Sequence, residues 1–379
     1  MISSVPLSTP IEEQLHSLHR TLQVELPPIT RVAVAVYDRK TDRLRTFAHS
    51  TEGESPLPHY ETRLSEVPSL KALAERRADR VVDDLTVFAE SEAEHSRAFQ
   101  GRWEASYTKP IFEGDRLRGF IFFDATEKAF FSPAVVQRLG VYAEFIALML
   151  ANSLFPARMI KSVVHVAAEV THSRDPETGA HLDRMSRYAR VIAEELAEAE
   201  GFSDAFVYYL YMFAPLHDIG KVAIPDHILL KPGRLTDEEL VVMRTHTVRG
   251  AEMIERVLTD LGSESLPHES ILRAVVRHHH EAWNGTGYPD GLAGGAIPIE
   301  ARIVTVADVF DALTTARPYK EAWPSEHAFA FLRDNAGRLF DPDCVRALEA
   351  RRDDVEAIRA RFTDAESATR LHEGYSHEL

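Results

Sequence analysis

The chain has 379 residues, of which 45% are hydrophobic and 27% charged, and its formal net charge is −16 at pH 7. This length exceeds one ordinary domain, and the hydrophobic fraction suffices for two cores. The acidic balance argues against binding to polymeric nucleic acid, and the single cysteine, Cys344, excludes a zinc module built on cysteine ligands. No run reaches the roughly eighteen consecutive apolar residues of a membrane-spanning helix, and no charged-then-apolar signal opens the chain, so we expect a cytoplasmic protein without a membrane segment.

The first part of the chain alternates apolar and polar residues in the manner of β-strands. The clearest predicted strands are residues 32–38, 43–48 and 117–124. The third of these forms a hairpin with residues 107–112, because a Glu-Gly-Asp-Arg turn lies between them. Helical stretches lie between and around the strands, so residues 1–131 are predicted to form an α+β domain.

Residues 132–154 carry apolar side chains at helical intervals and lead directly into the second half of the chain. We therefore predict a connecting signalling helix over residues 132–158 that pairs in a homodimer. Packing of the same helix on its own sheet accounts equally well for the pattern.

The second half contains histidines and carboxylates at spacings that suit a metal site. His217 and Asp218 follow an apolar stretch, so on a helix they project about 100° apart and grip one region jointly. Lys221 lies one turn further on. Nitrogen and oxygen ligands without a thiolate suit iron, manganese, zinc or nickel, whereas calcium and magnesium prefer oxygen ligands.

A second pair of candidate ligands lies upstream. Asp175 is predicted to cap a helix whose first residue is Pro176. Glu177 and His181 then lie at i and i+4 on one helical face, which is the spacing that a carboxylate and an imidazole need to share a metal.

Two further candidates lie inside predicted helices. His246 belongs to a helix that begins after the cap residue Thr236, and a solvated helix histidine is the alternative. Asp308 lies in an apolar helix over residues 301–313, where an acid needs a partner or a metal. Asp311, one turn later, is expected to accept a hydrogen bond that orients a ligand histidine.

Residues 270–280 predict a helix that ends in three consecutive histidines. Adjacent side chains radiate around a helix, so at most two of the three can face one cluster. We choose His279 and His280.

With these residues in order, residues 159–350 resemble the HD-GYP domain, a branch of the HD phosphohydrolase superfamily. The matching motifs are Arg174-Asp175, Thr178-Gly179, His181, His217 to Lys221, Ile224-Pro225-Asp226, Lys231-Pro232-Gly233, His246, His279 to Glu281, Gly287-Tyr288-Pro289, Ala301-Arg302-Ile303, Asp308 to Leu313 and Arg317-Pro318-Tyr319-Lys320. The resemblance implies an all-α HD-type catalytic domain over residues 159–379. It also implies hydrolysis of the bacterial second messenger cyclic di-GMP to the linear dinucleotide pGpG, and in some members on to GMP.

The resemblance implies a full site as well. The implied metal ligands are Glu177, His181, His217, Asp218, His246, His279, His280 and Asp308. They hold two or three divalent metal ions, iron with manganese as the alternative, and the presence of Glu177 argues for three. In our hypothesis Asp218 bridges two metals and Lys221 stabilises developing negative charge, although a lysine that interacts with a helix dipole is the alternative. The implied substrate-binding residues are Lys221, Gly287, Tyr288, Pro289, Arg317 and Lys320.

The loop around Tyr288 can stack on guanine or position a phosphate, and an ordinary tight turn is the alternative. Arg317 and Lys320 suit either phosphate or the C-terminal helix dipole, and the resemblance favours phosphate. The chain departs from the family at two places. Asn284 stands where the family usually has aspartate, and residues 259–270 are lengthened.

The α+β part resembles a GAF-type sensor domain on pattern alone. Such domains bind small molecules or dimerise, so the resemblance implies regulation by an unknown small-molecule or protein signal. Diguanylate cyclases of the GGDEF type are further expected partners.

Two other functions stay open at this point. One is an HD-type phosphohydrolase that acts on another nucleotide, and the other is a catalytically silent receptor or interaction module. Tyr288 and its neighbouring glycines favour the cyclic dinucleotide branch. The complete set of candidate ligands argues against a silent receptor.

Overall fold

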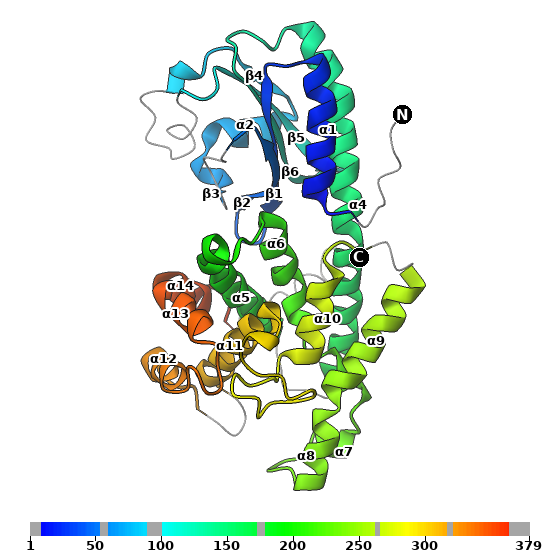
Figure 1. Cartoon of the computed structure of the whole chain (residues 1–379), viewed down its shortest axis with the longest axis vertical. Coiled ribbons are helices and arrows are strands. Elements are labelled where there is room, and N and C mark those ends of the chain that lie inside the picture. The colour runs from blue at the N-terminus through cyan, green and yellow to red at the C-terminus, as the bar shows by residue number, and fades with distance from the viewer. Residues whose placement is uncertain are drawn as a thin grey trace, which may run out of the picture. The chain divides into compact units, whose positions relative to one another are not determined.

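The computed structural model describes residues 9–53, 60–88, 101–172, 179–261, 266–316 and 321–363. The chain divides into two compact units, which are Met1–Phe155 with Ser203–Ala205 and Pro156–Phe202 with Phe206–Leu379. Figure 1 labels the elements of both. The predicted limits of the connecting helix, at residues 132 and 158, stay predictions.

The first unit is built on a six-stranded antiparallel sheet with the order β3-β2-β1-β6-β5-β4. The strands are β1 (Ile29–Asp38), β2 (Arg43–Thr51), β3 (Glu61–Arg63), β4 (Arg80–Val82), β5 (Ala105–Glu113) and β6 (Arg116–Ala125). The three predicted strands and the predicted hairpin are therefore confirmed. Gly114, at a φ of 56°, begins the two-residue turn between β5 and β6, where the left-handed backbone suits glycine.

Helices cover both faces of this sheet. α1 (Ile11–Glu25) and α4 (Pro133–His172) lie along one side, and α2 (Pro68–Arg76) lies on the other (Figure 1). The α2 side includes a core of Ala35, Leu44, Leu70 and Phe120. Two covered faces explain why β1 is nearly continuously apolar, with alternating valine and alanine, instead of alternating apolar and polar residues. The short 3-10 turns of this unit are Leu64–Glu66 and Leu85–Phe88.

The second unit is helical, and its described residues contain no strand beyond two isolated bridges. Its helices are α5 (Gly179–Glu200), α6 (Asp204–Phe213), α7 (Asp226–Leu229), α8 (Asp237–Arg244), α9 (His246–Leu261), α10 (Glu269–His278), α11 (Ile299–Thr314), α12 (Ser325–Asp334), α13 (Pro342–Ala350) and α14 (Arg352–Arg361). Three 3-10 turns, η3 (Ala214–Leu216), η4 (Ile219–Ala223) and η5 (Gly294–Ala296), connect them. The prediction of an α+β part followed by an all-α part is confirmed.

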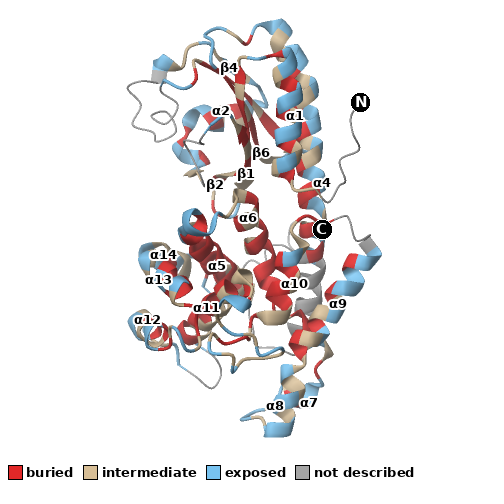
Figure 2. Ribbon diagram, in the orientation of Figure 1, coloured by how far each residue is buried: buried red, intermediate tan, exposed pale blue. Residues whose placement is uncertain are grey.

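α5 and α11 supply the centre of the helical core. α11 buries Ile303, Val306 and Phe310, and the ring of Phe310 meets that of Tyr188 on α5 edge to face at 5.4 Å. Figure 2 shows the buried residues concentrated on these two helices and on α10. Polar side chains that α5 and α11 turn toward one another therefore lie in a space with little water.

α4 runs without interruption from Pro133 to His172. Over Pro133–Ile160 it is, among the described residues, the one helix long and apolar enough to cross a membrane by length and composition alone. Core helices of soluble proteins meet the same criterion. The sequence expectation of no membrane segment rested on uninterrupted apolar runs, which Arg138 and Glu144 prevent.

A buried ion pair joins the central strands of the sheet. The Nη1 atom of Arg31 on β1 lies 2.5 Å from Oδ2 of Asp124 on β6, and their side chains are 5% and 0% exposed. The Ser106 hydroxyl donates to the other oxygen of Asp124 at 2.7 Å. Every oxygen of this buried carboxylate therefore has a partner.

We expect Asp124→Ala to lower the free energy of unfolding by about 3–5 kcal/mol, because it leaves the Arg31 charge buried without its carboxylate. Urea unfolding of the full chain, followed by circular dichroism, measures the change. Asp115→Ala is the control, since its carboxylate is 98% exposed, and it should leave the transition near that of the parent. Equal transitions for the two variants would contradict the assignment.

Candidate metal centre

His217 and Asp218 lie between two 3-10 turns and not on an α-helix. α6 ends at Phe213, η3 carries Pro215, and η4 begins directly after Asp218. Proline lacks the backbone N–H that an α-helix needs and its ring crowds the preceding turn, so the helix cannot continue. The expectation of a helical pair was therefore wrong, although the two side chains do serve one region.

Gly220 brings η4 against α9. A Cβ atom at this position would lie 1.8 Å from the carbonyl oxygen of His246 and 2.6 Å from the backbone nitrogen of Gly250. Only glycine permits this approach. His246, the first residue of α9, is thereby held beside Asp218 and is 2% exposed, so the alternative of a solvated histidine is wrong. The helix that begins after Thr236 ends at Arg244, so the prediction that it includes His246 was also wrong.

Three histidines are oriented by backbone carbonyl groups. The Nδ1 atoms of His217, His246 and His279 lie 2.9, 2.8 and 2.9 Å from the carbonyl oxygens of Ala214, Met243 and Val275. A carbonyl oxygen can only accept, so each Nδ1 carries the proton and each Nε2 presents a lone pair. This is the arrangement in which imidazole binds a metal.

The first donor group comprises Asp218, His246, His279 and His280, whose ligand atoms lie within 4.8 Å of one another. Oδ1 of Asp218 is 3.2 Å from Nε2 of His246 and 3.6 Å from Nε2 of His279. The two imidazole Nε2 atoms are themselves 3.4 Å apart. Lone pairs that face one another at this distance repel, and a cation between them turns the repulsion into attraction, so these donors fit a divalent metal ion.

The second donor group comprises His181, His217 and Asp308. Oδ1 of Asp308 is 3.7 Å from Nε2 of His181 and 3.9 Å from Nε2 of His217. Oδ2 of Asp218 lies 3.1 Å from the same His217 nitrogen. Asp218 therefore directs one oxygen to each group, which is the placement that a bridging carboxylate needs.

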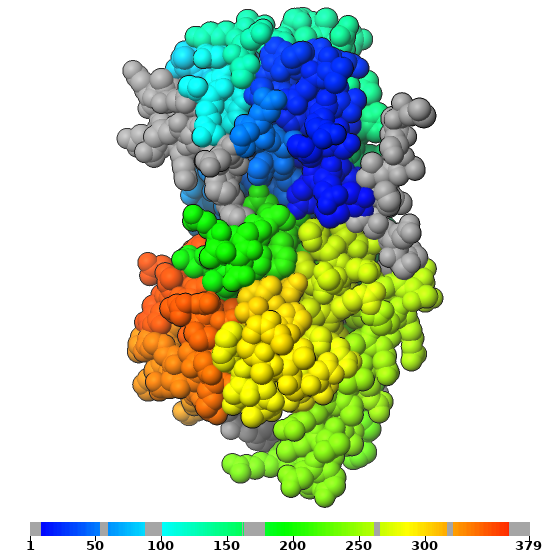
Figure 3. Space-filling view, in the orientation of Figure 1, coloured from blue at the N-terminus to red at the C-terminus, as the bar shows by residue number. Residues whose placement is uncertain are grey.

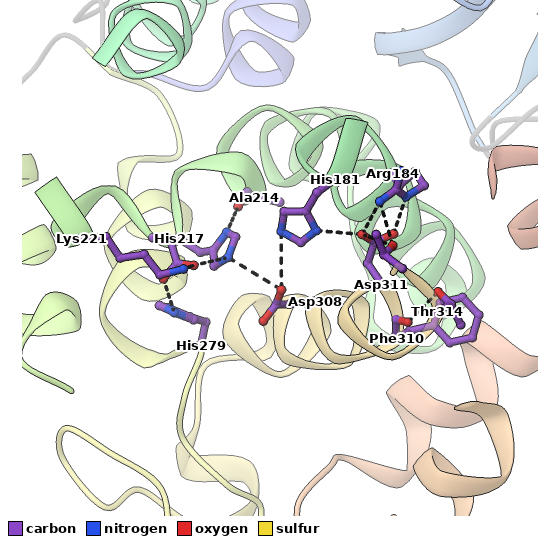
Figure 4. Close-up of polar contacts among 12 residues, drawn as sticks. His181, Arg184, Ala214, His217, Lys221, His279, Asp308, Phe310, Asp311 and Thr314 are labelled. Carbon is purple, nitrogen blue, oxygen red and sulfur yellow. Dashed lines mark hydrogen bonds and ion pairs between the residues drawn. The ribbon is translucent and has the colours of Figure 1, made fainter. Parts of the chain in front are cut away.

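Asp311 orients His181 from behind. Nδ1 of His181 donates to Oδ2 of Asp311 at 2.8 Å, which is the contact expected from the sequence (Figure 4). Arg184, one turn after His181 on α5, donates to both oxygens of Asp311 at 2.7 and 2.9 Å. Burial alone would raise the pKa of Asp311, but the hydrogen bonds from His181 and Arg184 hold it below its ordinary value. Our sequence analysis missed Arg184, although its i+3 spacing from His181 was visible.

Three of the candidate donors, Asp218, His279 and His280, are held in the protonation states that metals bind. Burial alone would raise the pKa of Asp218, but Lys221 and His217 bring it well below its usual range, with the Lys221 ammonium 2.8 Å from Oδ2. Burial lowers the pKa of His279, and lowers that of His280 strongly. Both imidazoles are therefore neutral at neutral pH, as a metal ligand must be.

α10 ends at His278, so His279 and His280 lie just beyond the helix instead of within it. His278 turns away and lies 3.0 Å from Oδ2 of Asp290. The choice of His279 and His280 as the pair that faces the cluster agrees with this geometry.

A carboxylate that our sequence analysis left without a role organises the following loop. Glu281, 3% exposed, accepts hydrogen bonds from the backbone N–H groups of Asp290, Gly291 and Leu292 at 2.7, 3.1 and 3.1 Å. The segment between α10 and α11, in yellow, is a continuous part of the surface of this unit (Figure 3). Glu281 thus fixes a surface loop from its buried side.

Tyr288 is a loop residue that contacts the first donor group. Gly287 makes its position possible, because a Cβ atom there would lie 2.2 Å from the backbone nitrogen of Ala282. The Tyr288 ring stacks on that of His280 at 4.8 Å, and the guanidinium of Arg244 lies 5.1 Å from its centroid. Burial raises the pKa of the Tyr288 hydroxyl, which stays protonated.

Asn284 keeps the acceptor role that an aspartate would have at the same place. Its side-chain oxygen accepts from the backbone N–H of Thr286 at 3.1 Å and from the Thr286 hydroxyl at 2.7 Å. This departure from the family changes the charge of the loop while leaving its turn intact.

Three predicted site residues, Glu177, Arg317 and Lys320, lie outside the described residues. The predicted N-cap at Asp175 does so as well. Among the described candidates, the structure brings the seven ligands of the two donor groups together, places Lys221 beside Asp218, and places Tyr288 beside His280.

The two adjoining donor groups of this helical unit, built from histidines and carboxylates, form a candidate dinuclear metal centre. Comparison with protein families gives the same region a name, because a family described as "HD domain" matches residues 173–344. Residues 173–344 of this chain are therefore similar to that family.

Curated relatives match the same half of the chain. "Cyclic di-GMP phosphodiesterase response regulator RpfG" of Xanthomonas campestris pv. campestris is 48% identical over 198 residues, which are 52% of this chain and 50% of the relative. "Cyclic di-GMP phosphodiesterase" of Vibrio cholerae is 44% identical, covering 54% and 42%. "3'3'-cGAMP-specific phosphodiesterase 2" of the same species is 39% identical, covering 54% and 37%. The chain spans half or less of the length of these relatives.

Solved structures are similar to part of the chain at low identity. "The crystal structure of the GAF domain/HD domain protein from Geobacter sulfurreducens" has 18% identity and a TM-score of 0.32, and the match covers 38% of this chain and 94% of that one. Likeness at this level adds nothing to the sheet order and core described above.

We expect Asp311→Asn to weaken metal binding by about 10- to 100-fold, because His181 loses the charged acceptor that orients its ring. Metal content after dialysis against stepped free-metal concentrations measures the change. Asp354→Asn is the control, since this carboxylate on α14 pairs with Arg351, the residue that precedes the helix. Unchanged occupancy in Asp311→Asn would show that the contact does not support the site.

Proposed function

We propose that the chain is a metal-dependent phosphodiesterase that hydrolyses cyclic di-GMP to pGpG and then to GMP. The observation that carries the proposal is Asp218, which directs Oδ1 to one donor group and Oδ2 to the other. Two adjacent sites suit an in-line displacement at phosphorus. The names of the Xanthomonas and Vibrio relatives support the choice of substrate.

Bound divalent ions would supply a nucleophilic water of lowered pKa and neutralise the non-bridging phosphate oxygens. His246, His279 and His280 with Asp218 would hold one ion, and His181, His217 and Asp308 with Asp218 a second. We propose iron as the metal, with manganese as the alternative, and a third ion held with Glu177. Imidazole and carboxylate donors accept both metals.

Lys221 is, among the described residues, a cation placed to act on the reacting phosphate. Its ammonium lies 2.8 Å from Oδ2 of Asp218, at the junction of the two donor groups, and its side chain is 20% exposed. A positive charge there stabilises negative charge that develops on the phosphate oxygens. The link to Asp218 also fixes its position before substrate arrives.

The loop residues suit a ligand that carries both bases and phosphates. Tyr288 offers an aromatic ring beside the first donor group, and Arg244 adds a cation next to that ring. Bases stack on aromatic side chains, and guanidinium groups bind phosphate. In this proposal Gly287 and Pro289 position Tyr288, while Arg317 and Lys320 bind the phosphates.

A second candidate substrate is another cyclic dinucleotide, because one relative is named for 3'3'-cGAMP. A silent receptor is less well supported, since a site that only binds has no need of both donor groups. We further propose that the first unit senses a small-molecule or protein signal, that GGDEF-type cyclases are partners, and that the protein acts in the cytoplasm.

Anaerobically purified, metal-analysed protein should convert cyclic di-GMP to GMP in a chromatographic assay that includes 3'3'-cGAMP in parallel. The double variant His217→Ala, Asp218→Ala should lose turnover, because it removes a donor from both groups. His278→Ala is the matched control and should stay active, since His278 faces Asp290. Full metal loading with substrate binding and no turnover would overturn the enzymatic proposal in favour of a receptor.

Tyr288→Leu should raise KM by about 5- to 150-fold, corresponding to the roughly 1–3 kcal/mol of a base–aromatic stack. Tyr288→Phe keeps the ring and should stay close to the parent. Steady-state kinetics on cyclic di-GMP distinguishes the two, and equal KM values in both variants would remove Tyr288 from substrate binding.

A further inference from the structure

α4 is apolar on two sides within the first unit. One side is buried and carries Leu139, Ala143, Ile146 and Leu150. The other side is exposed and also apolar: Val141, Phe145, Leu148 and Phe155 are 58%, 46%, 56% and 62% exposed. Figure 2 shows exposed residues along the length of this helix in the first unit. The sheet and α1 of the same chain therefore leave a large apolar surface uncovered.

The exposed side has the periodicity of a coiled-coil seam. Val141, Phe145, Leu148, Asn152 and Phe155 follow one another at intervals of four, three, four and three residues, and all five are exposed. In heptad terms Phe145 and Asn152 occupy position a, and the other three occupy position d. A stripe confined to a and d is narrower than the face a helix needs to pack on a globular core, and it suits a single partner helix.

We propose that this stripe, Val141 to Phe155, pairs with the same stripe of a second copy in a parallel, in-register two-stranded coiled coil. The polar member decides the orientation. In a parallel pair position a meets position a, so the two Asn152 amides face each other and can hydrogen-bond. In an antiparallel pair position a meets position d, so each Asn152 would be buried against an apolar residue without a partner.

A membrane is a poorer occupant of this surface. An ion pair ties α4 to its own unit, because Nζ of Lys109 on β5 lies 3.1 Å from Oε1 of Glu144. A helix with one side packed on a folded domain cannot be surrounded by lipid, as a spanning helix must be. Only the opposite stripe is available, and its width matches one helix.

The inference rests on α4 alone, so its test does not depend on whether the protein hydrolyses cyclic di-GMP. Cysteine cross-linking tests the register directly, because the only native cysteine, Cys344, is buried. Leu148→Cys places thiols at position d, where the two copies lie within disulfide reach. Ala147→Cys, one residue earlier, turns its thiol about 100° off the seam and is the matched control.

Under mild oxidation of the full chain, Leu148→Cys should give at least about ten-fold more covalent dimer than Ala147→Cys, since only position d meets the disulfide geometry. Equal or absent cross-linking of the two variants would overturn the parallel register. Circular dichroism of both variants verifies that the fold is unchanged.

Sedimentation velocity tests the surface without a new covalent bond. The parent should be a dimer, and Phe145→Asp with Leu148→Asp should make it a monomer, because each charge would be buried in the seam. A parent that is a monomer, or a double variant that remains a dimer, would overturn the proposal. A monomeric parent that co-sediments with phosphatidylcholine–phosphatidylglycerol vesicles would overturn the proposal and assign the stripe to a membrane surface.

Discussion

The helical unit is organised around an electrostatic conflict that only a cation resolves. Three imidazoles turn lone pairs toward Asp218 and Asp308, and none can rotate its N–H inward without breaking its bond to a backbone carbonyl. In water such groups would be solvated separately, but here they are largely buried and close together. The facing donors are therefore stabilised by a positive charge between them. A divalent ion can be coordinated by several donors at once, whereas a proton is shared by two at most.

Short side chains can converge only if their backbones do. Gly220 allows η4 to touch α9, and Gly287 allows the Tyr288 loop to touch the backbone at Ala282. Pro215 contributes in the opposite sense, since it ends the helical geometry just before the ligands. The buried carboxylates of Asp311 and Glu281 then fix what these approaches bring together, one by orienting His181 and the other by holding three backbone N–H groups. The donors are therefore ordered by the protein before any metal binds.

Structural features set by neighbouring residues were predictable from the sequence, whereas contacts between residues far apart in the sequence were not. The cap at Thr236 forms with Glu239 as a reciprocal pair three residues apart, so its helix began where the pattern indicated. The helical placement of His217 failed because periodicity ignores how one proline redirects a backbone. Arg184 and Glu281 escaped notice since their partners are defined only by folding, Asp311 lying 127 residues from Arg184 along the chain. The candidate donors could be proposed from the sequence, because metal chemistry restricts which residue types can bind a metal and the resemblance to HD-GYP domains supplied the positions.

α4 shows how one pattern can have two correct interpretations. Packing on its own sheet and pairing with a second copy were equal alternatives when only the sequence was considered, and the structure places a separate apolar stripe on each side of the helix. Because both stripes are apolar, few positions of the helix carry charge. The helix therefore has the composition of a membrane-spanning helix, although one of its sides is packed in its own unit. Composition averages over the circumference of a helix, whereas folding acts on each face separately. Asn152 distinguishes a partner helix from lipid. Lipid offers no hydrogen-bond partner to a polar side chain in the middle of an exposed apolar stripe, whereas the Asn152 of a second copy does.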